Sequence, residues 1–133
     1  MVTLFLPFPP SVNEAFGNNK RGRGKGRYKT AKYKAWLKEA DAWVLKQRAE
    51  KTIGTPVMGP YEAHMTFSVA KRRWNSDLSN RIKVAEDYLK RAELIEDDSK
   101  CENLNATWGP VDGVFLRVFK YLGSSSSNNS RIT

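Results

Sequence analysis

The spacing of apolar residues changes along this chain of 133 residues, and that change narrows the possible folds more than any other feature. Residues 2–6 form a short, apolar, β-prone run that Pro7 ends, and residues 61–69 alternate apolar with polar side chains, which is typical of a half-buried strand. Between and after these runs, apolar residues recur at steps of three and four, which is typical of one face of a helix. The chain therefore combines strands with helices.

Two segments carry the helical spacing. The first runs from residue 31 to about residue 49 with Thr30 as its N-cap, and the second runs from about residue 77 to residue 92. The apolar stripe of the first segment consists of Tyr33, Trp36, Leu37, Ala40, Trp43 and Val44. The second segment has an apolar side and a polar side, which are Leu78, Ile82, Ala85, Leu89 and Ala92, and Asp77, Asn80, Lys83, Asp87 and Arg91. Aromatic rings can stack on nucleic-acid bases, but helical spacing favours packing in a core.

Two further strands are expected near residues 102–108 and 114–121, joined by a turn that contains Gly109-Pro110 and Asp112-Gly113. The order strand, helix, strand, helix, strand, strand (β-α-β-α-β-β) predicts one α+β domain over residues 1–122, with a mixed β-sheet packed against two main helices. Residues 123–133 are rich in Ser and Asn, and we expect them to form a flexible tail.

The charge balance indicates the class of partner. Lys and Arg total 23 against 14 Asp and Glu, so the net charge is +9, which favours a polyanion. Nucleic acid is the first candidate, and an anionic membrane surface is the lesser one. We expect no membrane insertion, because no run is long and apolar enough to span a bilayer and no signal peptide is recognisable. The lone Cys101 suits a reducing compartment, so we expect a cytoplasmic protein.

Two basic segments are candidates for DNA binding. Residues 17–29 predict a flexible, Gly-rich basic loop, and a shorter basic run ends the strand at residues 61–69. Their cations are Lys20, Arg21, Arg23, Lys25, Arg27 and Lys29 in the loop, and Lys71, Arg72 and Arg73 in the run. The glycine spacing of the loop matches no phosphate-binding motif. The loop is therefore either an electrostatic clamp on a nucleic-acid backbone or a solvated segment without fixed contacts.

Elimination leaves carboxylates as the chemically useful groups. A single histidine, His64, and a single cysteine cannot supply a zinc site, and no spacing indicates a serine triad. Carboxylate oxygens suit Mg²⁺ or Mn²⁺, which activate water and stabilise charge on a phosphodiester. The candidate ligands are Asp77, Asp87, Asp97 and Asp98, with Lys83 as a nearby cation.

Each of these residues also has a purely structural interpretation. Asp77 or Ser76 can cap the second helix, and the pair Asp97-Asp98 can form a solvated turn. Lys83 and the acid four residues later can form a surface ion pair. Residue types and spacing alone therefore leave both interpretations open.

Three elements, in this order, resemble the RusA family of Holliday junction resolvases, which are crossover junction endodeoxyribonucleases. Residues 7–13 (PFPPSVN) resemble the family's P-x-P-P-S-x-N opening. Residues 77–83 (DLSNRIK) resemble its D-x-D-N-x-x-K helix start, and Asp87 falls on a recurrent acid. Residues 95–99 (IEDDS) resemble its downstream D-D element, and the likeness extends to about residue 121.

The resemblance implies a homodimer that binds four-way DNA junctions and cuts two opposed strands with Mg²⁺, in recombination and repair, without an organic cofactor. It places the catalytic acids, which also bind the metal, at Asp77 and Asp98, and the catalytic lysine at Lys83. Asp97 and Asp87 are further candidate ligands, and the supporting residues are Asn13, Ser79 and Asn80.

Ser79 is a departure from the family pattern, because it replaces the second acid of the helix start. A hydroxyl brings no charge, so it is a poorer metal ligand than a carboxylate. Asn80, Asp87 or Asp97 then completes the site, or the metal is held more weakly through water, or the protein binds junctions and cuts poorly. Activity is the favoured interpretation because the other positions match. The alternatives are a catalytically weak or inactive DNA-binding protein, and a less selective metal nuclease or RNA-binding protein.

Overall fold

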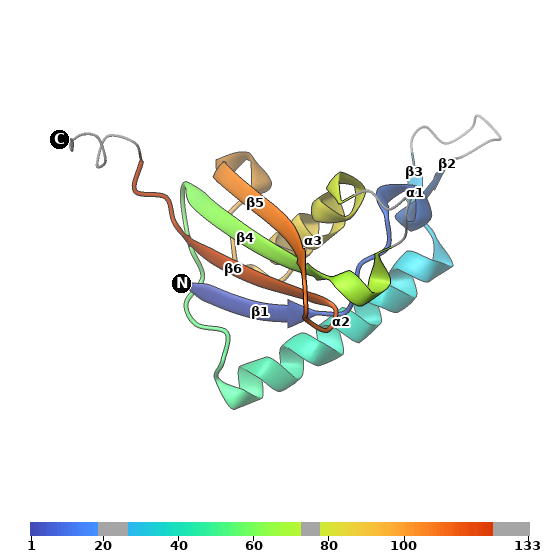
Figure 1. Cartoon of the computed structure of the whole chain (residues 1–133), viewed down its shortest axis with the longest axis horizontal. Coiled ribbons are helices and arrows are strands. Elements are labelled where there is room, and N and C mark those ends of the chain that lie inside the picture. The colour runs from blue at the N-terminus through green and yellow to red at the C-terminus, as the bar shows by residue number, and fades with distance from the viewer. Residues whose placement is uncertain (19–26, 73–77, 124–133) are drawn as a thin grey trace.

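Four strands form a mixed β-sheet in the computed structural model, which describes residues 1–18, 27–72 and 78–123. They are β1 (Val2–Leu6), β4 (Tyr61–Ser68), β5 (Cys101–Gly109) and β6 (Val114–Lys120), in the spatial order β1-β6-β4-β5 (Figure 1). β6 runs antiparallel to β1 and β4, whereas β4 and β5 are parallel. The predicted single α+β domain with a mixed sheet is confirmed.

The connection between β4 and β5 contains the second main helix, because parallel neighbours need a long crossover. After β4 come the 3-10 turn η1 (Val69–Lys71), the helix α3 (Ser79–Arg91) and the 3-10 turn η2 (Asp98–Lys100). The two C-terminal strands, β5 and β6, do not pair with each other, since β4 lies between them. The turn that joins them crosses the end of β4, where the amide of Ser68 donates to the carbonyl of Gly113 at 2.9 Å.

One face of the sheet carries the apolar side chains. Along β4 every second residue is buried, and the register aligns these positions with apolar ones on both neighbours. One row across the sheet reads Leu4, Leu116, Met65 and Ala106. The first three of these side chains are at most 1% exposed. Alternation along each strand thus produces a continuous apolar layer.

The helices α2 (Ala31–Glu50) and α3 join this layer in one hydrophobic core. Thr30 caps α2 as predicted, since its hydroxyl accepts from the amide of Tyr33 at 3.2 Å. The ring of Trp36 meets that of Tyr88 edge to face, with centroids 5.6 Å apart, and so links the two helices. The predicted stripe of α2 is buried except for Trp43, which is half-buried.

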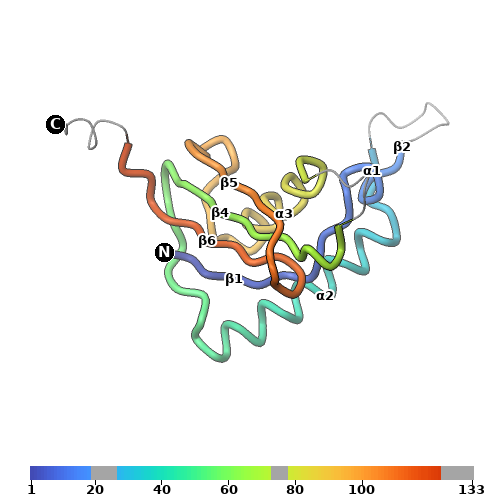
Figure 2. Tube along the Cα trace, viewed as in Figure 1, coloured from blue at the N-terminus to red at the C-terminus, as the bar shows by residue number. Residues whose placement is uncertain are grey.

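The N-terminal third contains elements that the sequence patterns did not predict. A one-turn helix, α1 (Val12–Ala15), follows the prolines, and the strands β2 (Phe16–Asn18) and β3 (Arg27–Lys29) pair antiparallel. The prediction of a loop over residues 17–29 is therefore wrong at both ends, while residues 19–26 lie outside the described part of the chain. The chain trace places α1 and the β2–β3 hairpin at the opposite end of the molecule from the N-terminus (Figure 2).

The starts of α3 and β5 differ from the predictions. α3 begins at Ser79, two residues later than expected, and β5 begins at Cys101. The tail predicted for residues 123–133 lies outside the described residues beyond Gly123. Among the described helices, none has the length and apolar character needed to span a membrane.

Candidate active site

Lys83 lies between two of the predicted carboxylates. Its ammonium donates to Oδ2 of Asp98 at 2.7 Å and lies 3.2 Å from Oδ1 of Asp87. Asp87 is one helical turn further along α3, whereas Asp98 belongs to η2, fifteen residues away in sequence. The fold thus brings two acids from separate elements to one cation.

These contacts determine the protonation state of Lys83. The hydrogen bond to Asp98 raises the pKa of the ammonium well above its usual value, and the contact with Asp87 acts in the same direction. Lys83 therefore carries a positive charge at neutral pH. It can stabilise negative charge, but it cannot accept a proton as a general base.

Asp97 has a different set of contacts from its neighbour. Its carboxylate lies 2.6 Å from the ammonium of Lys90 and accepts from the amide of Ser99 at 3.0 Å, which caps η2. The hydrogen bond from Lys90, followed by those from Ser99, lowers the pKa of Asp97 well below its usual value. The structural interpretation therefore fits Asp97, which orients the turn carrying Asp98.

A buried carboxylate lies on the same helix as Lys83 and Asp87. Glu86 of α3 is 9% exposed and accepts a 2.5 Å hydrogen bond from the hydroxyl of Tyr61, which is fully buried on β4. Burial, followed by the negative charge of Glu86, raises the pKa of the thiol of Cys101, the residue that follows η2. Glu86 thus connects α3 with the sheet and with the start of β5, and these elements carry Lys83 and Asp98.

Glu86 is a functional neighbour that the sequence analysis missed. A signal for it is present, because Glu86 stands four residues after Ile82 and three before Leu89, on the apolar side of α3. A charged residue in such a position indicates a buried polar contact.

The β2–β3 hairpin brings part of the basic segment to the site. Lys29 of β3 and Asp87 line a common hollow of about 270 Å³ together with the rings of Phe16 and Tyr33. Arg27 lies over the ring of Phe16, with its guanidinium carbon 5.0 Å from the centroid. The remaining cations predicted in this loop, Lys20, Arg21, Arg23 and Lys25, lie outside the described residues.

The second basic run lies at the end of β4. Lys71 and Arg72 are both exposed, and the guanidinium carbon of Arg72 is 5.7 Å from the ring centroid of Trp108. Arg73 and Asp77, the first predicted acid, lie outside the described residues.

The supporting residues fall at two helix starts. Asn13 is exposed on α1, Ser79 is exposed at the first position of α3, and Asn80 is half-buried beside it. Ser79 stands on the same helix as Lys83, one turn earlier.

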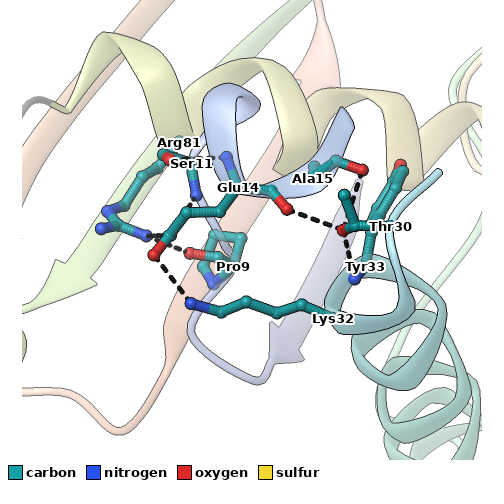
Figure 3. A network of polar contacts seen from close by, with 8 residues as sticks. All are labelled: Pro9, Ser11, Glu14, Ala15, Thr30, Lys32, Tyr33 and Arg81. Atoms are coloured by element: carbon teal, nitrogen blue, oxygen red, sulfur yellow. Dashed lines mark hydrogen bonds and ion pairs between the residues drawn. The ribbon is translucent and has the colours of Figure 1, made fainter. Parts of the chain in front are cut away.

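A polar network joins the N-terminal prolines to α3 (Figure 3). Ser11 and Glu14 form a capping box, and Glu14 also contacts Lys32 of α2 at 2.7 Å. Arg81 of α3 donates to the carbonyl of Pro9 at 2.7 Å and lies 3.6 Å from Glu14. Neither Glu14 nor Arg81 was among the predicted site residues, because the contacts between them link positions far apart in sequence.

Asp87 and Asp98 are two of the candidate metal ligands, and they lie near each other in the structure. Both carboxylates contact the ammonium of Lys83. Carboxylate oxygens are the ligands that Mg²⁺ and Mn²⁺ prefer. Among the described residues, no group of three or more Asp, Glu, His or Cys side chains is close enough to hold a metal ion.

Comparison with known proteins identifies one relevant family. The model of a family described as endodeoxyribonuclease RusA matches residues 7–118, which is most of the chain. No curated protein gives a significant match.

Proposed function

We propose, since this chain belongs to the endodeoxyribonuclease RusA family, that it binds four-way DNA junctions and cuts opposed strands with Mg²⁺ or Mn²⁺. The observation that carries the proposal is the position of Lys83 between Asp87 and Asp98, beside the basic hairpin. Acids next to phosphate-attracting cations are unfavourable for simple DNA binding, but they suit phosphodiester hydrolysis by a metal-dependent nuclease.

The metal would be held by Asp98 and Asp77, with Asp87 as a further ligand. When bound, it supplies a water of lowered pKa and neutralises charge on the phosphate. Lys83, which is held protonated by its two acids, stabilises the charge that develops on the phosphoryl or leaving oxygen. Asp97 keeps η2 in place through Lys90 and Ser99.

A homodimer is part of this proposal, because paired cutting of two opposed strands needs two sites related by symmetry. Light scattering of the full chain at working concentration should give twice the monomer mass of 15.1 kDa. A monomer that still cuts both strands in concert would contradict this part.

The test is cleavage of a labelled synthetic four-way junction, with Mg²⁺ or with a chelator. Asp98→Asn and Asp77→Asn should each lower cleavage by at least roughly 100-fold while junction binding remains, because each removes a metal ligand and loss of a mere outer-shell partner already costs about 10–100-fold. Lys83→Gln should lower it by about 10²–10³-fold through lost charge stabilisation. Asp112→Asn, in the exposed turn before β6, is the charge-matched control and should cut at the parental rate.

Two results bear directly on the assignment. If Asp77→Asn and Asp98→Asn cut at the parental rate, the assigned residues are wrong. If linear duplex, single strands and junctions are cut equally, the protein is a less selective nuclease.

A second candidate function is a junction-binding protein that cuts poorly. The observation in its favour is Ser79, which stands exposed at the start of α3 in the place of a family acid. This candidate predicts tight junction binding without cleavage at any Mg²⁺ or Mn²⁺ concentration. Ser79→Asp should then restore cleavage, whereas in an active nuclease it should change the rate by less than Lys83→Gln does.

A further inference from the structure

A groove of about 540 Å³ lies between residues 8–10, the start of α2 and the first turn of α3. Its lining does not include Lys83, Asp87 or Asp98. Its lining includes two aromatic rings, two acids and three cations, which are Phe8, Trp36, Glu14, Glu39, Lys32, Lys71 and Arg81. The three cations come from three separate elements, α2, η1 and α3. Such convergence of positive charge in a hollow is typical of an anion site.

The carboxylate of Glu14 contacts two of these cations. Its carboxylate lies 2.7 Å from the ammonium of Lys32 and 3.6 Å from the guanidinium of Arg81 (Figure 3). Hydrogen bonds from Lys32 and from the amide of Ser11 lower the pKa of Glu14 to about 2, so the group is an anion at neutral pH. The groove therefore already holds a negative charge, supplied by the chain itself.

The contact between Glu14 and Lys32 can open at small cost. The side chains of Lys32 and Glu14 are 61% and 40% exposed, and exposed ion pairs contribute little to stability. An incoming anion can therefore replace Glu14 as the partner of Lys32.

Arg81 and Lys71 are the remaining cations that a ligand in the groove can contact. Arg81 is oriented by the carbonyl of Pro9 and by the ring of Phe8, 4.8 Å from its guanidinium carbon. Its guanidinium lines the groove and faces the carboxylate of Glu14 at 3.6 Å, so a phosphate that displaces Glu14 can take the same place. Lys71 is exposed, and the described part of the chain shows no ion pair for it.

We propose that this groove binds a backbone phosphate of DNA through Lys32, Lys71 and Arg81, and that Glu14 occupies Lys32 and Arg81 until DNA displaces it. The ligand class rests on the proposed function, whereas the position of the groove does not. Arg81 and Lys83 are two residues apart on α3, so their side chains leave the helix about 200° apart. The phosphate in the groove is therefore a different one from the phosphate that is cut, and it positions the strand along α3.

The test is the salt dependence of junction binding by the full chain. Fluorescence anisotropy of a labelled four-way junction, with a chelator present to prevent cutting, gives the affinity from 50 to 200 mM KCl. The groove holds one phosphate, so complete loss of that contact should reduce the slope of log affinity against log salt by about 0.9. Lys71→Gln and Lys32→Gln should each bind more weakly and show part of this reduction.

Lys46→Gln is the matched control for these two variants. Lys46 is exposed on α2, fourteen residues after Lys32 and about 21 Å along the helix. Lys46→Gln removes the same charge at a distance from the groove. The slope of log affinity against log salt should therefore stay close to that of the parental chain.

Glu14→Gln should change affinity and slope in the opposite direction from the lysine variants. Glutamine can also serve at the third position of a capping box, so α1 should remain, while Lys32 and Arg81 lose their internal anion. Affinity should rise, and the slope should steepen by up to about 0.9. Glu50→Gln, at the far end of α2, removes the same charge and should raise affinity less.

The proposal is overturned if the groove variants shift affinity and slope no more than Lys46→Gln and Glu50→Gln do. If that occurs while the parental chain cuts junctions, the proposed function stands and the groove is not a DNA site. If the chain never cuts but the groove variants change the slope as expected, the nuclease proposal fails and the groove remains. A chain that binds no DNA contradicts both.

Discussion

Tyr61→Phe tests whether the buried contact between Tyr61 and Glu86 holds α3 on the sheet. The substitution removes one hydroxyl from a fully buried ring and leaves the carboxylate of Glu86 without the partner that donates at 2.5 Å. No steric change accompanies this loss, because phenylalanine fills the same space without the oxygen atom. The change in the free energy of unfolding therefore measures the lost hydrogen bond together with the cost of leaving a buried acceptor without this donor.

The size of the effect follows from burial. A hydrogen bond to a charged group contributes about 1.5–3 kcal/mol, and an acceptor left unsatisfied in the interior costs the upper part of that range. We expect Tyr61→Phe to lower the free energy of unfolding by about 2–3 kcal/mol. For a domain of this size the corresponding decrease in Tm is about 10 °C.

Urea unfolding with linear extrapolation, together with calorimetry, measures both quantities. Tyr28→Phe is the matched control, since Tyr28 is 56% exposed, and it should change stability by less than about 0.5 kcal/mol. Glu86→Leu should also destabilise the chain, because it removes the carboxylate that accepts from the hydroxyl of Tyr61.

The double variant Tyr61→Phe/Glu86→Leu removes both partners and should lose less than the sum of the single losses, with a coupling of at least about 1 kcal/mol. If Tyr61→Phe costs less than 0.5 kcal/mol, or if the two losses add, then the pair does not hold α3 in place.

Three further predictions concern local structure. Thr30→Ala should cost about 1 kcal/mol in urea unfolding, because it removes the cap that accepts from the amide of Tyr33; an unchanged midpoint would contradict the role of the cap. Glu14 has a pKa lowered from 4.5 to about 2, so its ion pairs should stabilise the fold above pH 4.5, and this contribution should be lost as the pH falls toward 2. Because Glu14 is partly exposed, the loss should be roughly 1 kcal/mol, and Glu14→Gln should abolish it in acid titrations followed by circular dichroism. Gly113→Ala should cost about 2 kcal/mol or more by the same unfolding assay, since φ is +70° and a Cβ would lie 2.1 Å from the carbonyl oxygen of Leu6; parental stability would contradict it.

Much of the fold could be predicted from local patterns. The apolar stripe of α2, its cap at Thr30 and the alternation along β4 each depend on residues within a few positions of one another. These signals are strong because helix and strand place side chains at fixed periods of 3.6 and 2 residues. The pairing of the strands could not be predicted from local patterns. The position of β4 between β5 and β6 depends on contacts between residues far apart in sequence.

The basic segment shows where local reasoning failed. Gly-rich and cationic residues indicate a solvated loop, but its ends pair as β2 and β3 beside α1. The capping box of Ser11 and Glu14 starts α1 just before the hairpin, and the hydroxyl of Thr30, the N-cap of α2, donates to the carbonyl of Glu14. Tertiary contacts thus overrode composition.

For the site, the sequence by itself determined which residues are chemically capable. A basic chain with one histidine and one cysteine leaves carboxylates and lysine as the groups for metal-dependent chemistry, and motif order indicated Asp98 and Lys83. The tertiary structure decided which of them meet. It separated Asp98, which contacts Lys83, from Asp97, which caps a turn, although the two are adjacent in sequence. The physical reason is that a backbone turn points neighbouring side chains in different directions, and only the packing of η2 against α3 determines what each one contacts.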